Sequence, residues 1–138
     1  KDAPKIYAKA NMSRNWSHVS NIPGPNNRFA EQAKFNANLS VEYKVNDAWN
    51  WVANYGIVSG GPLRVAADRI NLEQVRRSTS LTANWTIDKN TNLRFAVSNL
   101  LKQAYITQTR IWTPTTNYYS RRESRGGLFA SARLSLRF

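Results

Sequence analysis

Arginine and aromatic side chains recur in the stretches of this 138-residue chain that lack a regular apolar pattern. A guanidinium group donates charge-assisted hydrogen bonds to anions and is attracted to the face of an aromatic ring. Arginine and aromatic residues together therefore suit an anionic or catecholate-bearing ligand. Arg28 lies in one of these stretches, and the residues that we predict to bind a ligand are Trp16, Arg64, Arg69, Arg110, Trp112, Tyr118, Tyr119, Arg121 and Arg122.

The residue types needed for catalysis or metal binding do not occur in a useful pattern. His18 is the only histidine, and no acidic residue or second histidine lies at ligand spacing from it, which favours a solvated loop residue over a metal ligand. The eight carboxylates form no pair suited to general acid–base chemistry. Cysteine is absent, which excludes disulfides and thiolate metal sites. We predict a protein that is not an enzyme and that has no cofactor.

Six segments alternate apolar and polar residues, which is the period of a β-strand. The longest, "AKFNANLSVEYKV", alternates without a break from Ala33 to Val45, whereas ordinary strands have about five or six residues. The other five segments span residues 5–13, 49–57, 79–87, 93–97 and 128–138. No run of about 18 apolar residues is present, so the sequence predicts no membrane-spanning helix.

The connections between these segments are alternately long and short. Residues 14–32, 58–78 and 98–123 form long connections, while "NDA" (46–48) and "DKNTN" (88–92) are tight turns. In an up-and-down meander all long connections then lie at one end, as in transmembrane β-barrels. We therefore predict an all-β fold: an antiparallel up-and-down meander of about six long strands, part of a transmembrane β-barrel. No domain boundary divides residues 1–138.

The two faces of the predicted strands differ in charge. No position in the apolar phase of the six segments is charged, and the opposite phase holds asparagine, lysine and arginine. Thirteen residues at about 3.3 Å each, tilted by about 40°, rise about 30 Å and cover the apolar band of about 25 Å in an outer membrane. A soluble sheet with one face in solvent would show the same alternation of apolar and polar residues, but the length of the strands favours a bilayer.

The ends of the apolar face carry residues typical of a membrane interface. Aromatic residues near the tight turns predict an aromatic girdle made of Tyr43, Trp49, Trp51, Trp85, Phe95 and Phe138. Arg14 and Arg77 break the apolar phase at the long-loop ends of their strands. There they could pair with the phosphates of lipopolysaccharide in a bacterial outer leaflet.

The net charge of +12 raises nucleic acid as a partner. A nucleic-acid surface would gather basic residues in one stripe with exposed aromatics. Here the charges are distributed over all the connections, and one face of every predicted strand is uncharged. We therefore expect no nucleic-acid partner.

The motif "LRFAVSNLLKQAY" (93–105) resembles the penultimate strand and following loop of TonB-dependent outer-membrane receptors, through Asn99, Leu100, Leu101 and Tyr105. The closing "LFASARLSLRF" resembles the last strand of that family. The resemblance implies that Leu134, Leu136 and Phe138 carry the signal read by the barrel-assembly machinery. "NLSVEYKVNDAWNWVANY" (38–55) resembles two strands paired across a periplasmic turn.

This resemblance implies a bacterial outer-membrane location and TonB-dependent uptake of a scarce solute, most commonly a ferric siderophore, with cobalamin and oligosaccharides as other cargoes. Members of the family have roughly 22 strands, a plug domain and a region that contacts TonB. Six strands cannot close such a barrel, so we expect a C-terminal segment of a receptor, without the plug and the earlier strands.

Two other interpretations fit the same pattern. A small or oligomeric passive outer-membrane barrel could be built from several copies of the chain. A soluble β-sandwich could bind polyanions or sugars through the basic connections.

Overall fold

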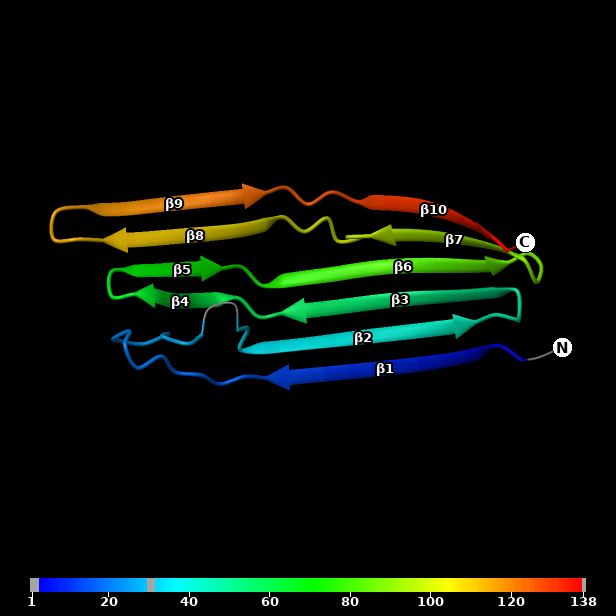
Figure 1. Ribbon diagram of the computed structural model, residues 1–138, viewed down its shortest axis with the longest axis horizontal. Coiled ribbons are helices and arrows are strands. Elements are labelled where there is room, and N and C mark those ends of the chain that lie inside the picture. The colour runs from blue at the N-terminus through cyan, green and yellow to red at the C-terminus, as the bar shows by residue number, and fades with distance from the viewer. Residues whose placement is uncertain (1–2, 30–31, 138) are drawn as a thin grey trace.

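The chain folds as antiparallel β-structure. A computed structural model describes residues 3–29 and 32–137, which form ten strands (Figure 1). None of the described segments is a helix long and apolar enough to cross a membrane. The strands are β1 (Lys5–Arg14), β2 (Phe35–Lys44), β3 (Trp49–Val58), β4 (Gly61–Ala66), β5 (Arg69–Glu73), β6 (Arg76–Thr86), β7 (Thr91–Ser98), β8 (Tyr105–Trp112), β9 (Asn117–Ser124) and β10 (Phe129–Leu136).

The six segments with alternating sequence form one six-stranded sheet in the order β1-β2-β3-β6-β7-β10. Every pair in this sheet is antiparallel, so the all-β antiparallel meander predicted from the sequence is confirmed. The strand spans differ slightly from those predicted. The longest alternating segment forms a strand of ten residues, not thirteen, because pairing ends at Phe35 and Lys44.

The long connections are not all irregular, and here the sequence-based prediction was incomplete. Strands β4, β5, β8 and β9 lie within them and form a second sheet in the order β4-β5-β8-β9. Figure 1 shows this sheet continuing the first one at the end away from the chain termini. Segments such as "NYYSRRES" carry polar residues on both faces, so they give no period-2 apolar signal although they pair as strands.

The tight turns lie together at the opposite end of the six-stranded sheet (Figure 1). Between β2 and β3, the side-chain oxygen of Asn46 accepts hydrogen bonds from the backbone N–H groups of Ala48 and Trp49, both at 2.9 Å. Between β6 and β7, Asp88 accepts one from the backbone of Asn90 at 2.7 Å. These side chains take the place of a backbone acceptor, which is why Asn and Asp favour such turns.

The pairing register aligns apolar residues with apolar residues across all six strands. One cross-strand row reads Ala8, Val41, Ala53, Leu81, Val97 and Ala130. The next row, on the opposite face, reads Lys9, Ser40, Asn54, Ser80, Ser98 and Phe129. The sheet therefore has one continuous apolar face and one predominantly polar face.

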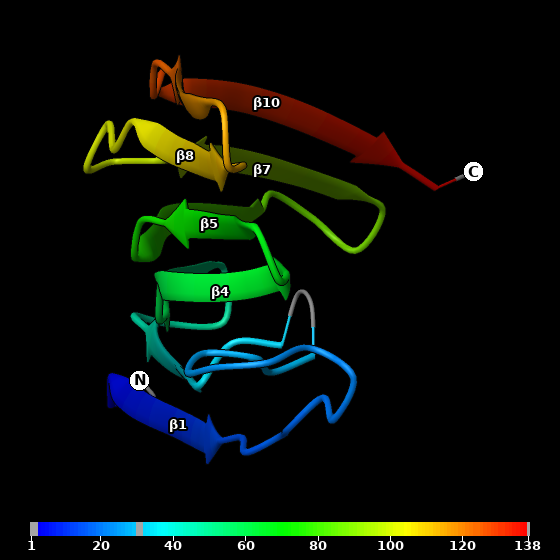
Figure 2. The ribbon, with the colours of Figure 1, turned by 90° about the vertical axis from the view of Figure 1, so that its left-hand side faces the viewer.

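No hydrophobic core covers the apolar face within the described residues. In the described part of the chain, Leu63 and Ala83 are the only buried hydrophobic residues, with 4% and 6% of their surface exposed, and Met12 is 79% exposed. Figure 2, viewed along the strands, shows the strands in a single curved layer. A protein of this size normally buries its apolar residues between two layers, so this uncovered face needs a partner outside the described part of the chain.

The sheet is open. Strands β1 and β10 lie at its two edges, and each pairs with a neighbour on one side only. The described strands therefore do not close into a barrel.

Candidate functional site

Eight of the nine residues predicted to bind a ligand lie on the four-stranded sheet. Arg64 is on β4, Arg69 on β5, Arg110 and Trp112 on β8, and the remaining four on β9. Trp16 lies in the β1–β2 connection, where it is 75% exposed. The structure therefore gathers residues from three sequence regions at the long-loop end of the molecule.

The register divides these residues between the two faces of the small sheet. Arg64, Ile70, Arg110 and Tyr119 form one cross-strand row, so their side chains share a face. Arg69, Tyr118 and Arg122 have the opposite parity and lie on the other face. We call the larger group the arginine face, which consists of Arg64, Arg110, Trp112, Tyr119 and Arg121.

Charge on the arginine face is mostly positive. Arg121 forms an ion pair with Glu123 at 3.1 Å, and both side chains are about half exposed. An exposed pair of this kind contributes little to stability, but it offsets one positive charge. Arg64 and Arg110 remain as the cations from neighbouring hairpins that could meet an anion.

Arg64 has the most restricted surroundings on the arginine face. Its guanidinium group lies 5.3 Å from the centroid of the Trp112 ring, a cation–π distance. Its Nη1 donates to the carbonyl oxygen of Pro23 at 2.8 Å. Its Nε is buried and has no hydrogen-bond partner among the described residues. Because an unpaired buried donor is costly, this atom is a candidate contact for a bound acceptor.

The β1–β2 connection packs against β4 through Arg64 and Arg28. The backbone N–H of Arg64 donates to the carbonyl oxygen of Asn26 at 2.9 Å, and Arg28 Nη1 donates to that of Pro62 at 2.7 Å. Gly24 has a φ of +92°, and a Cβ there would lie 2.6 Å from Arg64 Nη1. The positive φ favours glycine at this position, and a side chain there would also displace the end of the Arg64 side chain.

Asn27 fixes the loop internally and was not predicted as a functional residue. It is only 8% exposed, and its side-chain amide donates to the carbonyl oxygens of Val19 and Ile22 at 3.1 and 2.7 Å. The sequence could have indicated this role, because Asn27 ends the Pro- and Gly-rich stretch "IPGPNN" and asparagine in such stretches commonly hydrogen-bonds to the backbone.

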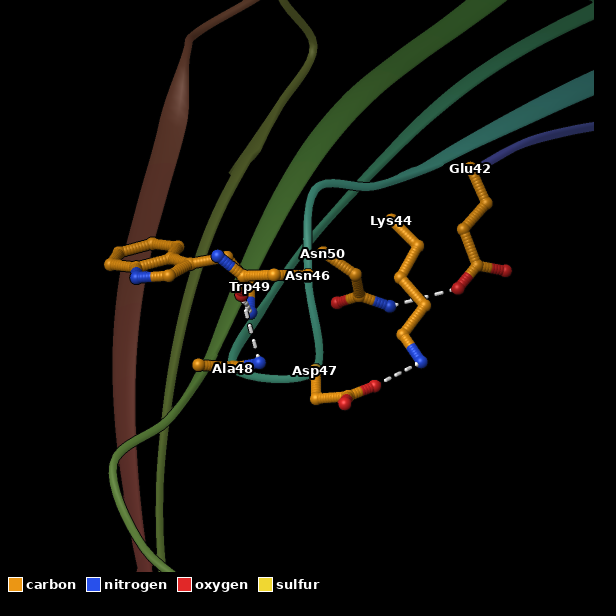
Figure 3. Close-up of polar contacts among 7 residues, drawn as sticks. All are labelled: Glu42, Lys44, Asn46, Asp47, Ala48, Trp49 and Asn50. Carbon is orange, nitrogen blue, oxygen red and sulfur yellow. Dashed lines mark hydrogen bonds and ion pairs between the residues drawn. The ribbon is translucent and has the colours of Figure 1, made fainter. Parts of the chain in front are cut away.

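A second polar feature lies near the tight turns, on the polar face of the large sheet. One cross-strand row there reads Lys5, Lys44, Asn50, Asn84, Arg94 and Arg133. Asn84 donates to Asn50 at 2.7 Å, and Asn50 donates to Glu42 at 2.9 Å. Figure 3 shows the Asn50–Glu42 bond beside the turn. Five residues of this row line a cavity of about 610 Å³: Lys44, Asn50, Asn84, Arg94 and Arg133.

The turn itself holds an ion pair between Lys44 and Asp47, with 2.7 Å between Nζ and Oδ1 (Figure 3). The hydrogen bond from Lys44 and its positive charge lower the pKa of Asp47 below the ordinary value of an aspartate. The Asp47 side chain is 77% exposed, so solvent screens this interaction.

The predicted girdle residues occupy the two apolar rows nearest the tight turns. Trp49 and Trp85 are stacked at 5.2 Å in the first row, and Trp51 lies 6.3 Å from Trp49 in the second. The second row reads Ile6, Tyr43, Trp51, Ala83, Phe95 and Ala132. Phe138, predicted for both the girdle and the assembly signal, lies outside the described residues.

The other predicted residues occupy exposed positions. Leu134 and Leu136, predicted to carry the assembly signal, are 57% and 53% exposed on β10. His18 is exposed in the β1–β2 connection, and no cluster of metal-ligating side chains occurs in the described part of the chain. Comparison of the chain with protein-family models, with curated proteins and with solved structures finds no match.

We expect Arg64→Ala to loosen the β1–β2 connection, because it removes the bond to Pro23 and the contact with Trp112. A hydrogen bond from a charged group contributes about 1.5–3 kcal/mol, so backbone amides such as that of Val19 should exchange roughly ten- to a hundredfold faster. Hydrogen exchange followed by mass spectrometry measures this. Arg69→Ala, on the opposite face, is the matched control. Equal exchange in the two variants would show that Arg64 does not hold the loop.

We expect Asp47 to make stability pH-dependent in the acid range. Because the folded-state pKa of Asp47 is lowered, its contribution is complete at neutral pH, and it is lost as the pH falls below about 3.9 through the lowered value. Denaturant unfolding of the protein and of Asp47→Asn at neutral and acid pH measures the difference. The two proteins should differ at neutral pH and converge in acid; a constant difference would contradict this assignment.

Proposed function

We propose that the six-stranded sheet is part of the wall of a bacterial outer-membrane β-barrel, with its apolar face against lipid acyl chains. The observation that carries the proposal is the continuous apolar face, which no other described part of the protein covers. A soluble β-sandwich would place a second sheet against such a face. Lipid is the alternative cover, since acyl chains need no complementary protein surface.

The strand length supports a bilayer. Strands β1, β2 and β3 each have ten residues. At about 3.3 Å per residue and a tilt of about 40°, they rise about 25 Å, which equals the height of the apolar band of outer-membrane barrels.

The apolar face also has two different borders. Tyr43, Trp51 and Phe95, with Trp49 and Trp85 beyond them, form the border near the tight turns. Aromatic residues concentrate at membrane–water interfaces because their rings are amphipathic. At the other border, Arg77 lies eight residues from Trp85 on β6, which is about 26 Å along the strand and about 20 Å of rise at a tilt of about 40°. The uncharged zone between these borders is therefore close to the apolar band of about 25 Å in outer-membrane barrels.

A complete barrel requires more strands than the sheet contains. Unpaired strand edges are not tolerated in hydrocarbon, and β1 and β10 both have one. We propose that a longer receptor of the TonB-dependent kind supplies the other strands, together with a plug and a TonB-contacting region. A ring of several copies, forming a passive barrel, is the second candidate that the open edges permit.

The motif that carries the family resemblance has a defined structural role. Asn99 adopts a left-handed conformation with φ of 56° directly after β7. Its side chain donates to the carbonyl oxygen of Gly127 at 2.7 Å, and its backbone N–H donates to that of Thr79 at 2.7 Å. Asn99 therefore connects three chain segments where the large sheet gives way to the small one. Asparagine tolerates this conformation better than most residues.

The proposed cargo is anionic and most commonly a ferric siderophore. The arginine face combines guanidinium groups with the rings of Trp112 and Tyr119, a combination that suits carboxylate or catecholate groups. In this proposal the protein is not an enzyme and does not bind nucleic acid. Leu134, Leu136 and Phe138 serve recognition by the barrel-assembly machinery.

We expect Leu81→Arg to impair membrane folding, because Leu81 lies in the central apolar row. An arginine at the bilayer midplane of a barrel costs about 2–4 kcal/mol. Ser80→Arg, the adjacent residue on the polar face, is the matched control and should fold normally. Folding of the full-length receptor into lipid vesicles, followed by protease protection, compares the two. Equal folding of both variants would contradict contact between the apolar face and lipid.

We expect Arg110→Ala to weaken ferric-siderophore binding about tenfold or more, because it removes a charge-assisted hydrogen bond from the arginine face. Titration of the full-length receptor in detergent with ferric catecholate and ferric hydroxamate chelates, followed by tryptophan fluorescence, measures the affinity. Arg69→Ala, on the opposite face, should change it less than twofold. The same loss in both variants, or no binding of either chelate by the unmodified protein, would contradict the proposed cargo.

A further inference from the structure

The apolar face contains a groove near the long-loop end of β1, β2 and β3. Its volume is about 390 Å³. Small and large side chains alternate across the strands, because Ala10 pairs with Leu39 while Met12 pairs with Ala37. The two alanines form the floor of a depression between larger neighbours. The groove is lined by the side chains of Ala10, Met12, Ala37, Leu39, Tyr55 and Ile57.

A basic pocket of about 380 Å³ adjoins the groove on the side of the β1–β2 connection. Arg14 and Phe35 line this pocket and pair with each other across β1 and β2. This pair is next to the Met12–Ala37 pair on the same face of the sheet, on the side of the β1–β2 connection. Among the residues that the structure describes, the pocket is lined by three cationic residues, Arg14, Arg28 and Lys34, and by no carboxylate. The groove and the pocket are therefore adjacent, and they differ sharply in chemistry.

Two of the cations in the basic pocket are held in place. The guanidinium group of Arg14 lies 5.1 Å from the centroid of the Trp16 ring. Arg28 is only 9% exposed and donates to the carbonyl oxygens of Pro62 and Gln32 at 2.7 and 3.1 Å. A guanidinium group has five N–H donors, so Arg28 keeps further donors for an anion. Guanidinium groups that are held in place suit phosphate groups.

A further cation borders the groove from the other side. Arg77 on β6 pairs with Ile57, which lines the groove. Arg14 and Arg77 thus flank the same apolar depression at its loop end. An amphiphile with an acyl chain in the groove would have anionic headgroup contacts on both sides.

We propose that the groove and the basic pocket together form a specific site for lipopolysaccharide, with one acyl chain in the groove and a headgroup phosphate in the pocket. This inference rests on the proposed function, which places the long-loop end of the sheet in the outer leaflet. Lipopolysaccharide carries several phosphates there, which matches the three cationic residues that line the pocket. A phospholipid carries a single phosphate and would leave part of this positive charge unmatched.

The test measures lipid binding by the purified full-length receptor in detergent, using native mass spectrometry. The probes are phosphorylated lipopolysaccharide with a short sugar chain, the same lipid after enzymatic dephosphorylation, and phosphatidylglycerol. We expect Arg14→Gln to reduce binding of the phosphorylated lipid at least fivefold and to leave the already weak binding of the dephosphorylated form unchanged. Lys89→Gln, in a tight turn, is the matched charge control and should bind normally.

The groove is tested separately from the charge. Ala37→Phe fills the depression without changing any charge, and we expect at least fivefold weaker binding of the phosphorylated lipid. Ala53→Phe, on the same face outside the groove, should bind normally. Ala10→Leu is a second groove-filling variant, in case Ala37→Phe folds poorly as judged by circular dichroism.

Three results would overturn the proposed site. They are unchanged binding in the folded groove-filling variants, unchanged binding in Arg14→Gln, and equally tight binding of phosphatidylglycerol. None of these results would contradict the proposed membrane function if Leu81→Arg and Ser80→Arg still differ in their folding into lipid vesicles. Failure of the full-length receptor that contains these strands to fold into vesicles would instead overturn the membrane function and this site together.

Discussion

The pairing register of six antiparallel strands is the constraint on which the rest of this structure depends. In a strand, a shift of one residue moves every side chain to the other face. Here the register between β1 and β2 matches Ala8 with Val41 and Lys9 with Ser40, and the same agreement continues to β10. The ladder satisfies the backbone hydrogen bonds between neighbouring strands without a second layer. A sheet with one apolar face and no core can then be stable, provided that something apolar covers that face.

The same ladder pattern explains how the long connections acquire order. Beyond the large sheet, four further strands pair with one another, although β8 and β9 carry polar residues on both faces and β5 has only five residues. Gly60 lies between β3 and β4, and a Cβ at this position would collide with the carbonyl oxygen of Glu73. The backbone after β5 can approach Gly60 closely only because this residue is glycine. The result is a set of loops held by backbone hydrogen bonds. Residues of the arginine face are positioned by strand pairing rather than by individual loop conformations.

Polar groups on the opposite face of the large sheet are satisfied by one another. Asn84, Asn50 and Glu42 form a chain of hydrogen bonds, and Asn38 donates to Asn11 at 3.2 Å. Such bonds between neighbouring strands favour one register over its alternatives, in the same way as apolar matching does on the other face. On the small sheet, the buried Nε of Arg64 has no partner among the described residues, and it lies at the predicted ligand-binding surface.

The sequence by itself determined the large sheet, because the period-2 alternation and the alternately long and short connections are local properties. The antiparallel meander, the uncharged face and the sorting of connections all follow from them. The alternation did not reveal β4, β5, β8 and β9, because β4 and β5 are short, with six and five residues, and β8 and β9 carry polar residues on both faces. It also could not separate Arg64 and Arg110 from Arg69, since only the pairing register decides which side chains share a face. The groove beside Arg14 and the packing of Arg28 against β4 depended likewise on contacts between residues distant in the chain. Tertiary structure alone decided these features, because each needs two strands or loops to meet at a defined offset.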